Sequence, residues 1–388
     1  MHQSIIRWYL IAVLWCLGTV IGSAQEVQSL LIRIKAVGKE GAGNIEAARA
    51  WKELVAQGPG VLPDVLAGMD DASPIAVNWL RGAVEAIQDK ATINNLQLPA
   101  DKIEAFLKDT KHAGHSRRLA YECLVRLDRT AADRLLPTML DDPGSELRRD
   151  AVAAMLKLGN AKLKTGSDDN GAHKQFYEGM LKFARDRDQV NEICEVLKKD
   201  HKIDIDLVKH FGFITRWQLV GPFDNVKGVG FHNVYPPEKG VDVKSTYAGK
   251  NGTTVNWQEY TTSKATKELG LLDLTQVYGK LKGAVVYGHA VVSSESERSV
   301  ELRAGSNNAV RIWLNGKEIY FREEYHHGKE MDQHVGKGLL KKGRNEILVK
   351  VCQNEQTDSW AQEWSFQVRV CDALGAAVPM LNVTEKIK

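Results

Sequence analysis

Five aromatic or polar side chains near the end of the sequence have types that suit the binding of a sugar: Arg322, Tyr325, Asn354, Asp358 and Trp360. An aromatic ring stacks on the apolar face of a sugar, while amide, carboxylate and guanidinium groups hydrogen-bond its hydroxyl groups. The five residues fall in two long polar stretches, 322–332 and 353–363, that interrupt a pattern of strands. Loops held by a rigid scaffold are common binding sites. We therefore predict a glycan site on these stretches, with Trp360 as the stacking ring.

Three arginines form a second set with regular spacing. Arg81, Arg118 and Arg149 each stand two residues before an alanine that recurs along the N-terminal half of the chain. One interpretation is a basic stripe that binds an acidic protein partner. The alternative is that each arginine pairs with an acidic residue on the next repeat, as surface charges commonly do.

The sequence contains no pattern that is diagnostic of catalysis. A nucleophile elbow, a phosphate loop, a dinucleotide-binding glycine motif and a zincin helix are all absent. The residues Glu323, Glu324, His326, His327 and His334 are close enough in sequence to suggest zinc or copper. Adjacent histidines on an extended chain point in opposite directions, however, and helical ligand spacing is missing. We therefore predict no catalytic residue, no metal site and no enzymatic activity.

Composition and charge limit the classes of partner. The chain has 388 residues, of which 43% are hydrophobic and 26% are charged, as in an ordinary globular protein. Two domains are the default for this length. The formal net charge is +3, and no basic patch stands out. We expect no nucleic-acid partner.

Residues 1–24 have the pattern of a secretory signal peptide. Arg7 provides the positive flank, residues 8–20 the apolar run, and residues 22–24 a small-x-small cleavage site. The apolar run is too short for a membrane span, and a retained signal anchor is the alternative. We expect an exported protein, periplasmic or extracellular, with no membrane span in its mature chain.

Four cysteines follow that segment: Cys123, Cys194, Cys352 and Cys371. They have neither C-x-x-C nor zinc spacing. Cys352 and Cys371 end two strands that we expect to be antiparallel neighbours, so they would lie at opposite edges and could not bridge. Buried thiols are the favoured interpretation.

The three arginines lie in a segment with helical periodicity, from about residue 26 to residue 210. Ala47, Ala83, Ala120 and Ala151 each begin a pattern in which small residues precede a large one at helical spacing. Such spacing lets a helix pack closely on its neighbour. The large residues that complete the pattern include Leu127 and Leu158.

This segment resembles HEAT repeats, and the likeness is best at residues 136–158. Leu136-Pro137 begins a short helix there, Asp141-Asp142 ends it, and residues 147–151 read Leu-Arg-Arg-Asp-Ala, as the start of the second helix does in that family. Arg117 has the equivalent place before Ala120. The resemblance implies an α-solenoid of about four helical pairs over residues 25–210, which contacts a protein partner.

The predicted glycan-binding residues lie in a segment with strand periodicity. Residues 310–315 alternate apolar and other side chains, and Asn315-Gly316 tolerates the positive φ angles of a type I′ hairpin turn. Ten strands are expected, over residues 215–220, 241–247, 253–260, 284–293, 299–304, 310–315, 318–322, 333–340, 346–352 and 365–371. Short strands at close spacing predict a sandwich or a barrel.

Several blocks of this segment resemble a galactose-binding-like jelly roll, as found in secreted bacterial proteins that also carry HEAT repeats. The blocks are residues 217–223, 235–238, 310–316, 339–351 and 364–370. The resemblance implies a jelly-roll sandwich over residues 211–388, whose relatives often bind glycans at rim loops. Relatives often carry Asp-Asp where this chain has Asn307-Asn308. Neutral amides are weaker calcium ligands than carboxylates, so no cofactor is expected.

Together these observations predict a multidomain α plus β protein, with an N-terminal HEAT-like α-solenoid followed by an all-β jelly-roll sandwich. We expect an exported, non-catalytic binding or scaffold protein, in which the solenoid contacts a protein and the sandwich binds a glycan or another protein. Two alternatives stay open: a carbohydrate-active enzyme or accessory subunit, and a purely structural component of the envelope.

Overall fold

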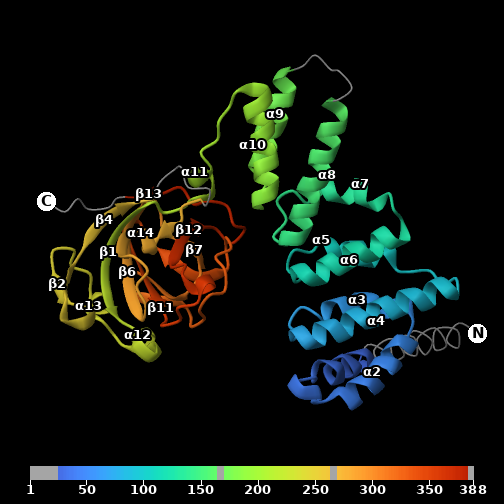
Figure 1. Cartoon of the computed structure of the whole chain (residues 1–388). Coiled ribbons are helices and arrows are strands. Elements are labelled where there is room, and N and C mark those ends of the chain that lie inside the picture. Colours follow the sequence, from blue (N-terminus) through green and yellow to red (C-terminus); the bar gives the residue numbers. More distant parts are fainter. Residues whose placement is uncertain (1–24, 164–169, 263–268, 383–388) are drawn as a thin grey trace, which may run out of the picture. The chain divides into compact units, whose positions relative to one another are not determined.

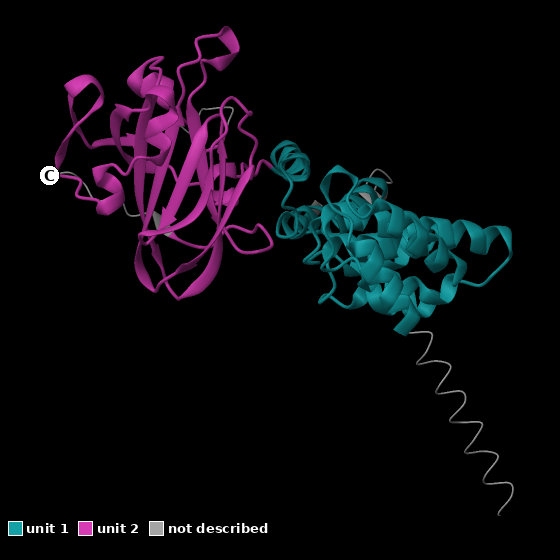
Figure 2. Cartoon of the chain, turned by 90° about the horizontal axis from the view of Figure 1, so that it is seen from below, with its two compact units in different colours: residues 1–201 teal, residues 202–388 magenta. Residues whose placement is uncertain are grey.

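The chain divides into two compact units, residues 1–201 and residues 202–388 (Figure 2). The computed structural model describes residues 25–163, 170–262 and 269–382. The first unit is helical and the second is built on antiparallel sheets, so the fold is mixed α plus β. The predicted signal peptide, residues 1–24, lies outside the described residues.

Among the described residues, none of the helices combines the length and the apolar composition that a membrane crossing needs.

The first unit is a succession of helices that begins with helical residues 25–35 (Figure 1). The elements that follow are η1 (Lys39–Gly41), α2 (Asn44–Ala56), η2 (Pro59–Val61), α3 (Leu62–Ala67), α4 (Pro74–Ile93), α5 (Ala100–Lys108), α6 (Gly114–Leu127), α7 (Ala131–Leu135), η3 (Leu136–Thr138), α8 (Ser145–Leu163), α9 (Asn170–Leu181) and α10 (Arg187–His201). Short helices alternate with long ones. Helix α4 begins where Ser73 accepts a hydrogen bond from the Ala76 amide at 3.2 Å, with Pro74 as its first residue.

The recurring alanines lie at the centre of the first unit. Ala47, Ala83, Ala120 and Ala151 are each 0% exposed, on α2, α4, α6 and α8. The absence of a larger side chain lets neighbouring helices approach closely there. The same pattern was wrong for two of its large residues: Leu127 is 53% exposed and Leu158 is 45% exposed. Both lie on long helices, on the side that turns away from the shared core.

A buried ion pair links successive helices of this unit. Arg117 on α6 donates to both carboxylate oxygens of Asp142, at 2.8 and 2.6 Å, and to the Leu107 carbonyl at 2.7 Å. Arg148 on α8 donates to the Asp142 carbonyl at 2.6 Å. Arg117 and Asp142 are almost completely buried. The turn that contains Asp142, between η3 and α8, is thereby fixed to both α6 and α8.

The second unit has two antiparallel sheets that face each other, and a third sheet in which β2 pairs only with β3. The larger runs in the order β4-β1-β6-β11-β8-β9, with β13 also paired to β6, and the smaller runs β10-β7-β12-β5. The strands are β1 (Arg216–Asp224), β2 (Thr246–Ala248), β3 (Thr254–Asn256), β4 (Gln258–Thr261), β5 (Leu272–Asp273), β6 (Ala284–Ser294), β7 (Arg298–Ser306), β8 (Ala309–Leu314), β9 (Lys317–Arg322), β10 (His334–Leu340), β11 (Gly343–Gln353), β12 (Ser365–Cys371) and β13 (Leu381–Asn382). The short helices are α11 (Leu207–Phe211), η4 (Val226–Gly228), α12 (Val229–His232), α13 (Pro236–Lys239), η5 (Lys250–Gly252), α14 (Leu274–Tyr278) and η6 (Ser359–Ala361). Apolar side chains of both sheets form one core, which includes Trp217, Trp364 and Phe366.

The hairpin between β8 and β9 confirms the turn predicted from the sequence. Asn315 has a φ of 52° and Gly316 a φ of 79°, the left-handed conformations that a type I′ turn requires. The side chain of Asn315 also accepts a hydrogen bond from the Glu346 amide at 2.9 Å. The turn is therefore fixed to β11 as well as to its own two strands.

A crossover segment, residues 225–247, covers the outer face of the larger sheet. Lys350, 0% exposed, donates to the Glu238 carboxylate at 2.8 Å and to the Asn233 carbonyl at 2.7 Å. Tyr287 donates to the same carboxylate. The strand predicted at 241–247 was wrong except at its end, because Asp242 accepts hydrogen bonds from the Lys244 amide and the Ser245 hydroxyl and so forms a turn.

The cysteines are not arranged as the sequence suggested. Cys352 is the next-to-last residue of β11 in the larger sheet, whereas Cys371 ends β12 in the smaller one, so the two strands are not neighbours. Burial raises the pKa of each of these thiols, and of Cys123, to about 12.

Candidate functional site

The predicted stacking ring is displayed at one end of the second unit. Trp360 lies on η6 and is 62% exposed. Its ring meets the His326 imidazole edge to face, with centroids 5.5 Å apart and planes at 89°. The indole therefore packs against a residue of the other predicted loop, and the two polar stretches 322–332 and 353–363 come together. We call this pair of loops the rim.

His326 is held in place by backbone and side-chain contacts. Its φ is 63°, and its amide donates to the Asn307 carbonyl at 2.6 Å. Its Nε2 lies 2.8 Å from Asn354 Oδ1, which also accepts from the Gln356 amide at 3.1 Å. Asn354 thus joins the two loops of the rim. A support whose own position is fixed keeps the indole in one orientation, which lowers the entropy lost on binding.

Tyr325 is linked through Asn225 to the start of the second rim loop. Its hydroxyl accepts a hydrogen bond from Asn225 Nδ2 at 3.2 Å, and the same amide donates to the Gln353 carbonyl at 3.0 Å. Burial raises the pKa of Tyr325 to about 12, so the phenol is neutral at physiological pH. Asn225 is 0% exposed. It connects the crossover segment to both rim loops.

Two of the predicted residues lie apart from this cluster. Arg322 is exposed and pairs with Glu324, so its guanidinium is not directed at Trp360 by any contact of the described residues. Asp358 precedes η6 and accepts from Gln356 Nε2 at 3.2 Å. Of the five predicted residues, Trp360, Tyr325 and Asn354 form one connected cluster through His326. The sequence had suggested His326 only as a metal ligand.

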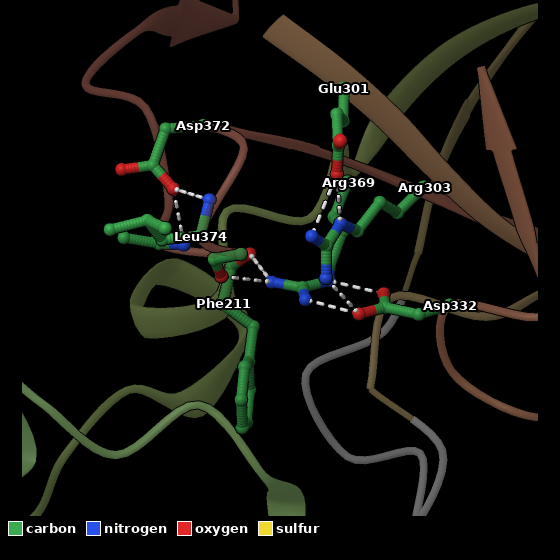
Figure 3. Close-up of polar contacts among 9 residues, drawn as sticks. Phe211, Glu301, Arg303, Asp332, Arg369, Asp372 and Leu374 are labelled. Atoms are coloured by element: carbon green, nitrogen blue, oxygen red, sulfur yellow. Dashed lines mark hydrogen bonds and ion pairs between the residues drawn. The ribbon is translucent and has the colours of Figure 1, made fainter. Parts of the chain in front are cut away.

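The far end of the first rim loop is fixed by a partly buried ion network (Figure 3). Arg369 on β12 donates to both oxygens of Asp332, at 2.6 and 2.5 Å, and Arg303 on β7 donates to the same carboxylate at 2.9 Å. Arg369 also donates to the carbonyls of Phe211 and Gly375. Burial alone would raise the pKa of Asp332, but hydrogen bonds and charge from Arg369 and Arg303 hold that pKa below its usual value.

The histidines and acids after β9 do not converge. Glu323 lies 3.0 Å from His232, and His334 lies 2.9 Å from the Tyr320 hydroxyl, where burial lowers the pKa of the imidazole. In the part of the chain that the structure describes, no group of three or more His, Cys, Asp or Glu side chains is arranged to hold a metal ion.

The two adjacent amides Asn307 and Asn308, at the predicted position of weak calcium ligands, have structural contacts. Asn307 Nδ2 donates to Glu363 Oε2 and Asn308 Nδ2 donates to the Glu363 carbonyl, both at 3.0 Å. Both amides are buried. They fix the end of the second rim loop to the turn between β7 and β8.

The three arginines of the first unit all contact acidic side chains of the next long helix. Arg81 pairs with Glu122 on α6 at 2.7 Å, Arg118 with Asp150 on α8, and Arg149 with Asp188 on α10 at 2.5 Å. This is the pairing that the sequence left open as an alternative. Binding of a protein partner by these arginines stays a prediction.

A shallow pocket of about 620 Å³ lies beside the last of these pairs, between α8 and α10. Its lining residues include Arg149, Lys157, Asn160 and Glu192. Both signs of charge face it, so a partner that binds there must present complementary charges.

Comparisons with known proteins identify no family for this chain. No family model and no curated protein matches it. Among solved structures, a GH31 α-xylosidase from Xanthomonas citri is 10% identical over 40% of this chain and 17% of its own, with a TM-score of 0.21. A β-glucosidase from Kluyveromyces marxianus is 7% identical over 75% of this chain and 35% of its own, with a TM-score of 0.26. The same enzyme in complex with glucose is 10% identical over 79% and 37%, with a TM-score of 0.21.

This chain therefore spans well under half the length of each of these proteins. The prediction that it is not an enzyme is contradicted by these matches to glycoside hydrolases, and we withdraw it. TM-scores this low carry no argument for a shared fold, so the activities of those enzymes are not transferred to this chain.

Proposed function

We propose that this protein is an exported carbohydrate-binding protein that holds a glycan at the rim of its second unit and a protein partner through its first. The single observation that carries the proposal is the Trp360 indole, 62% exposed and supported edge to face by His326. An exposed aromatic ring in a fixed orientation is well suited to stack on a sugar. Export is part of the proposal because residues 1–24 have the pattern of a signal peptide.

We propose further that the second unit is a galactose-binding-like jelly roll. Two facing antiparallel sheets around one core, with strands that are adjacent in space but distant in sequence, support this assignment. The rim loops follow β9 and β11, and β11 lies inside the larger sheet. Such a scaffold keeps the loops that bind a ligand in register.

For the first unit we propose a HEAT-like solenoid that contacts a protein. The alternation of short and long helices, the buried alanines and the Arg117–Asp142 link support it. Stacked helical repeats present extended surfaces, which suit the binding of another protein.

A single stacking ring gives a weak site. We expect dissociation constants from millimolar to tens of micromolar, which correspond to about 4–7 kcal/mol of binding free energy. Because the ring is central to the site, its removal should cost about 1–3 kcal/mol of that energy.

The test is a glycan array with the full two-unit chain, followed by titration of the bound glycans. Trp360→Ala should weaken binding, while Leu339→Ala, which removes another exposed apolar side chain on β10, should not. Unchanged affinity in Trp360→Ala, or no array signal, would overturn the proposal. The same glycans should be assayed for cleavage, because turnover that is lost in Glu323→Gln would assign a hydrolytic activity to the rim.

A further inference from the structure

Two aromatic rings in the described part of the second unit are exposed to solvent. They are Trp360, 62% exposed, and Phe321, 63% exposed; the remaining Phe, Tyr and Trp side chains described in this unit are buried or half-buried. Exposed large rings are unusual on a soluble surface and mark binding sites when they occur together. The question is whether Phe321 belongs to the same site as Trp360.

One short segment carries Phe321 and contacts the ring of Trp360. Phe321 is near the end of β9, and Trp360 packs on His326, five residues further along the chain. Five residues of extended chain span no more than about 18 Å. Between Phe321 and His326 in the sequence are Glu323, paired with His232 at 3.0 Å, and the half-buried Tyr325, whose hydroxyl accepts from Asn225. The segment 321–326 therefore connects the two rings with polar groups in between.

A charged pair with a fixed position lies beside the Phe321 ring. Arg311, opposite it on β8, has its guanidinium 5.8 Å from the centre of the Phe321 ring. That guanidinium donates to both oxygens of Glu318, at 2.5 and 3.0 Å, and to the Phe231 carbonyl at 3.1 Å. Such a pair can donate hydrogen bonds to the hydroxyl groups of a sugar and accept hydrogen bonds from them. Because its side chains are already held in place, little conformational entropy is lost when the sugar binds.

Charge along the segment favours a neutral ligand. Three carboxylates lie on this segment or beside it: Glu323 and Glu324 on the segment, and Glu318 on the same strand as Phe321. The cationic partners Arg311 and Arg322 are already engaged with Glu318 and Glu324. An acidic glycan would bring further negative charge to this surface and would be repelled.

We propose that the ligand of the rim is a neutral glycan chain, which lies along residues 321–326 with one sugar stacked on Trp360 and a later sugar stacked on Phe321. This inference rests on the proposed function, since it specifies the ligand class of the same site. The ring of Phe321 is a specificity-determining contact for chain length, and the pair Glu323–His232 contacts the sugars in between.

The experiment uses neutral oligosaccharides from disaccharides to octasaccharides of cellulose, xylan, mannan and chitin, with oligogalacturonates as the acidic comparison. The full chain, Trp360→Ala, Phe321→Ala and the control Leu339→Ala are titrated with each series. Phe321→Ala should leave the affinity for the shortest oligosaccharides unchanged and lower that for the longest about tenfold, the size of a moderate contact in an interface. Trp360→Ala should weaken binding at every length.

The outcomes separate this inference from the function on which it rests. If Trp360→Ala weakens binding but Phe321→Ala leaves long oligosaccharides unaffected, the extended site is wrong and the rim site stands. Equal loss in Phe321→Ala at all lengths would also overturn the extended site, because the ring would then contact the first sugar. Stronger binding of oligogalacturonates than of neutral chains would overturn the ligand class. No effect of Trp360→Ala would remove the proposed function itself.

Discussion

Arg369 on β12 donates two hydrogen bonds to Asp332, one to each carboxylate oxygen, at 2.6 and 2.5 Å. Asp332 is at the end of the first rim loop and has a φ of 66°, a conformation that residues other than glycine rarely adopt. The arginine is 1% exposed. The position of the first rim loop therefore depends on an ion pair whose arginine is buried in the smaller sheet.

Removal of this pair should destabilise the second unit. Asp332→Asn leaves the buried guanidinium of Arg369 without its charged partner, and such changes cost about 3 kcal/mol. Urea unfolding measured for the variant and for the parent protein checks the value. Asp358→Asn, at an exposed position, is the matched control and should change the free energy of unfolding by less than about 0.5 kcal/mol. Equal effects of the two substitutions would contradict a structural role for the Asp332 pair.

The same pair predicts how stability depends on pH. The pKa of Asp332 is lower in the folded protein than in the unfolded chain. Its contribution to stability is therefore complete above the ordinary aspartate pKa of about 3.9 and is lost as the pH falls through the lower, folded value. The difference in unfolding free energy between the parent and Asp332→Asn should be constant near neutral pH and should shrink below about pH 4. A difference that grows in acid would contradict this assignment.

The contributions of Lys350 and Glu238 to the free energy of unfolding should be coupled. Lys350 is 0% exposed and holds the crossover segment to β11 through the Glu238 carboxylate and two backbone carbonyls. Lys350→Met and Glu238→Gln should each lower the free energy of unfolding by about 3 kcal/mol, because each leaves a buried partner unsatisfied. The double variant should lose less than the sum, as residues in contact do. Lys337→Met, at an exposed position on β10, is the control for loss of a lysine charge. Additive losses would mean that the two side chains are not coupled.

Much of the fold could be predicted from local patterns in the sequence. The alanines predicted which helices pack closely because a small side chain at a helix contact has a direct geometric effect, and Asn315-Gly316 predicted its hairpin because few residue pairs tolerate that turn. The strand expected at 241–247 was wrong because the Asp242 carboxylate accepts a hydrogen bond from the Lys244 amide, which competes with strand pairing. Local periodicity contains no information about such competition.

Only part of the candidate site could be predicted from the sequence. Trp360, Tyr325 and Asn354 could be proposed because aromatic and amide side chains in polar loops suit a sugar, whatever their distance in space. The roles of His326 and Asn225 in the rim could not be predicted, since they depend on contacts over long sequence separations, as when Asn225 donates to the Gln353 carbonyl. Arg322 was included on type alone, and its pairing with Glu324, two residues further along the chain, directs its guanidinium to that carboxylate.

His326 should control binding through Trp360. His326→Ala removes the ring on which the indole packs and the 2.8 Å contact with Asn354, so both rim loops lose a connection. We expect weaker glycan binding by about 1 kcal/mol, since an aromatic pair contributes roughly that much. His327→Ala, at the next and more exposed position, is the control. Titration of both variants with one bound glycan checks the difference, and equal affinities would show that the indole needs no support from His326.

Arg117 and Arg118 form a matched pair for the first unit. They are neighbours on α6, but Arg117 is buried against Asp142, whereas the side chain of Arg118 is 23% exposed and pairs with Glu122 and Asp150. Arg117→Met should cost about 3 kcal/mol or more because it leaves Asp142 buried without its partner. Arg118→Met should cost less than about 1 kcal/mol, and salt should reduce even that loss. Unfolding measured at low and high ionic strength tests both statements. If Arg118→Met proved as destabilising as Arg117→Met, the row formed by Arg81, Arg118 and Arg149 would be a structural element of the first unit. A protein partner would then have to bind elsewhere on the helices.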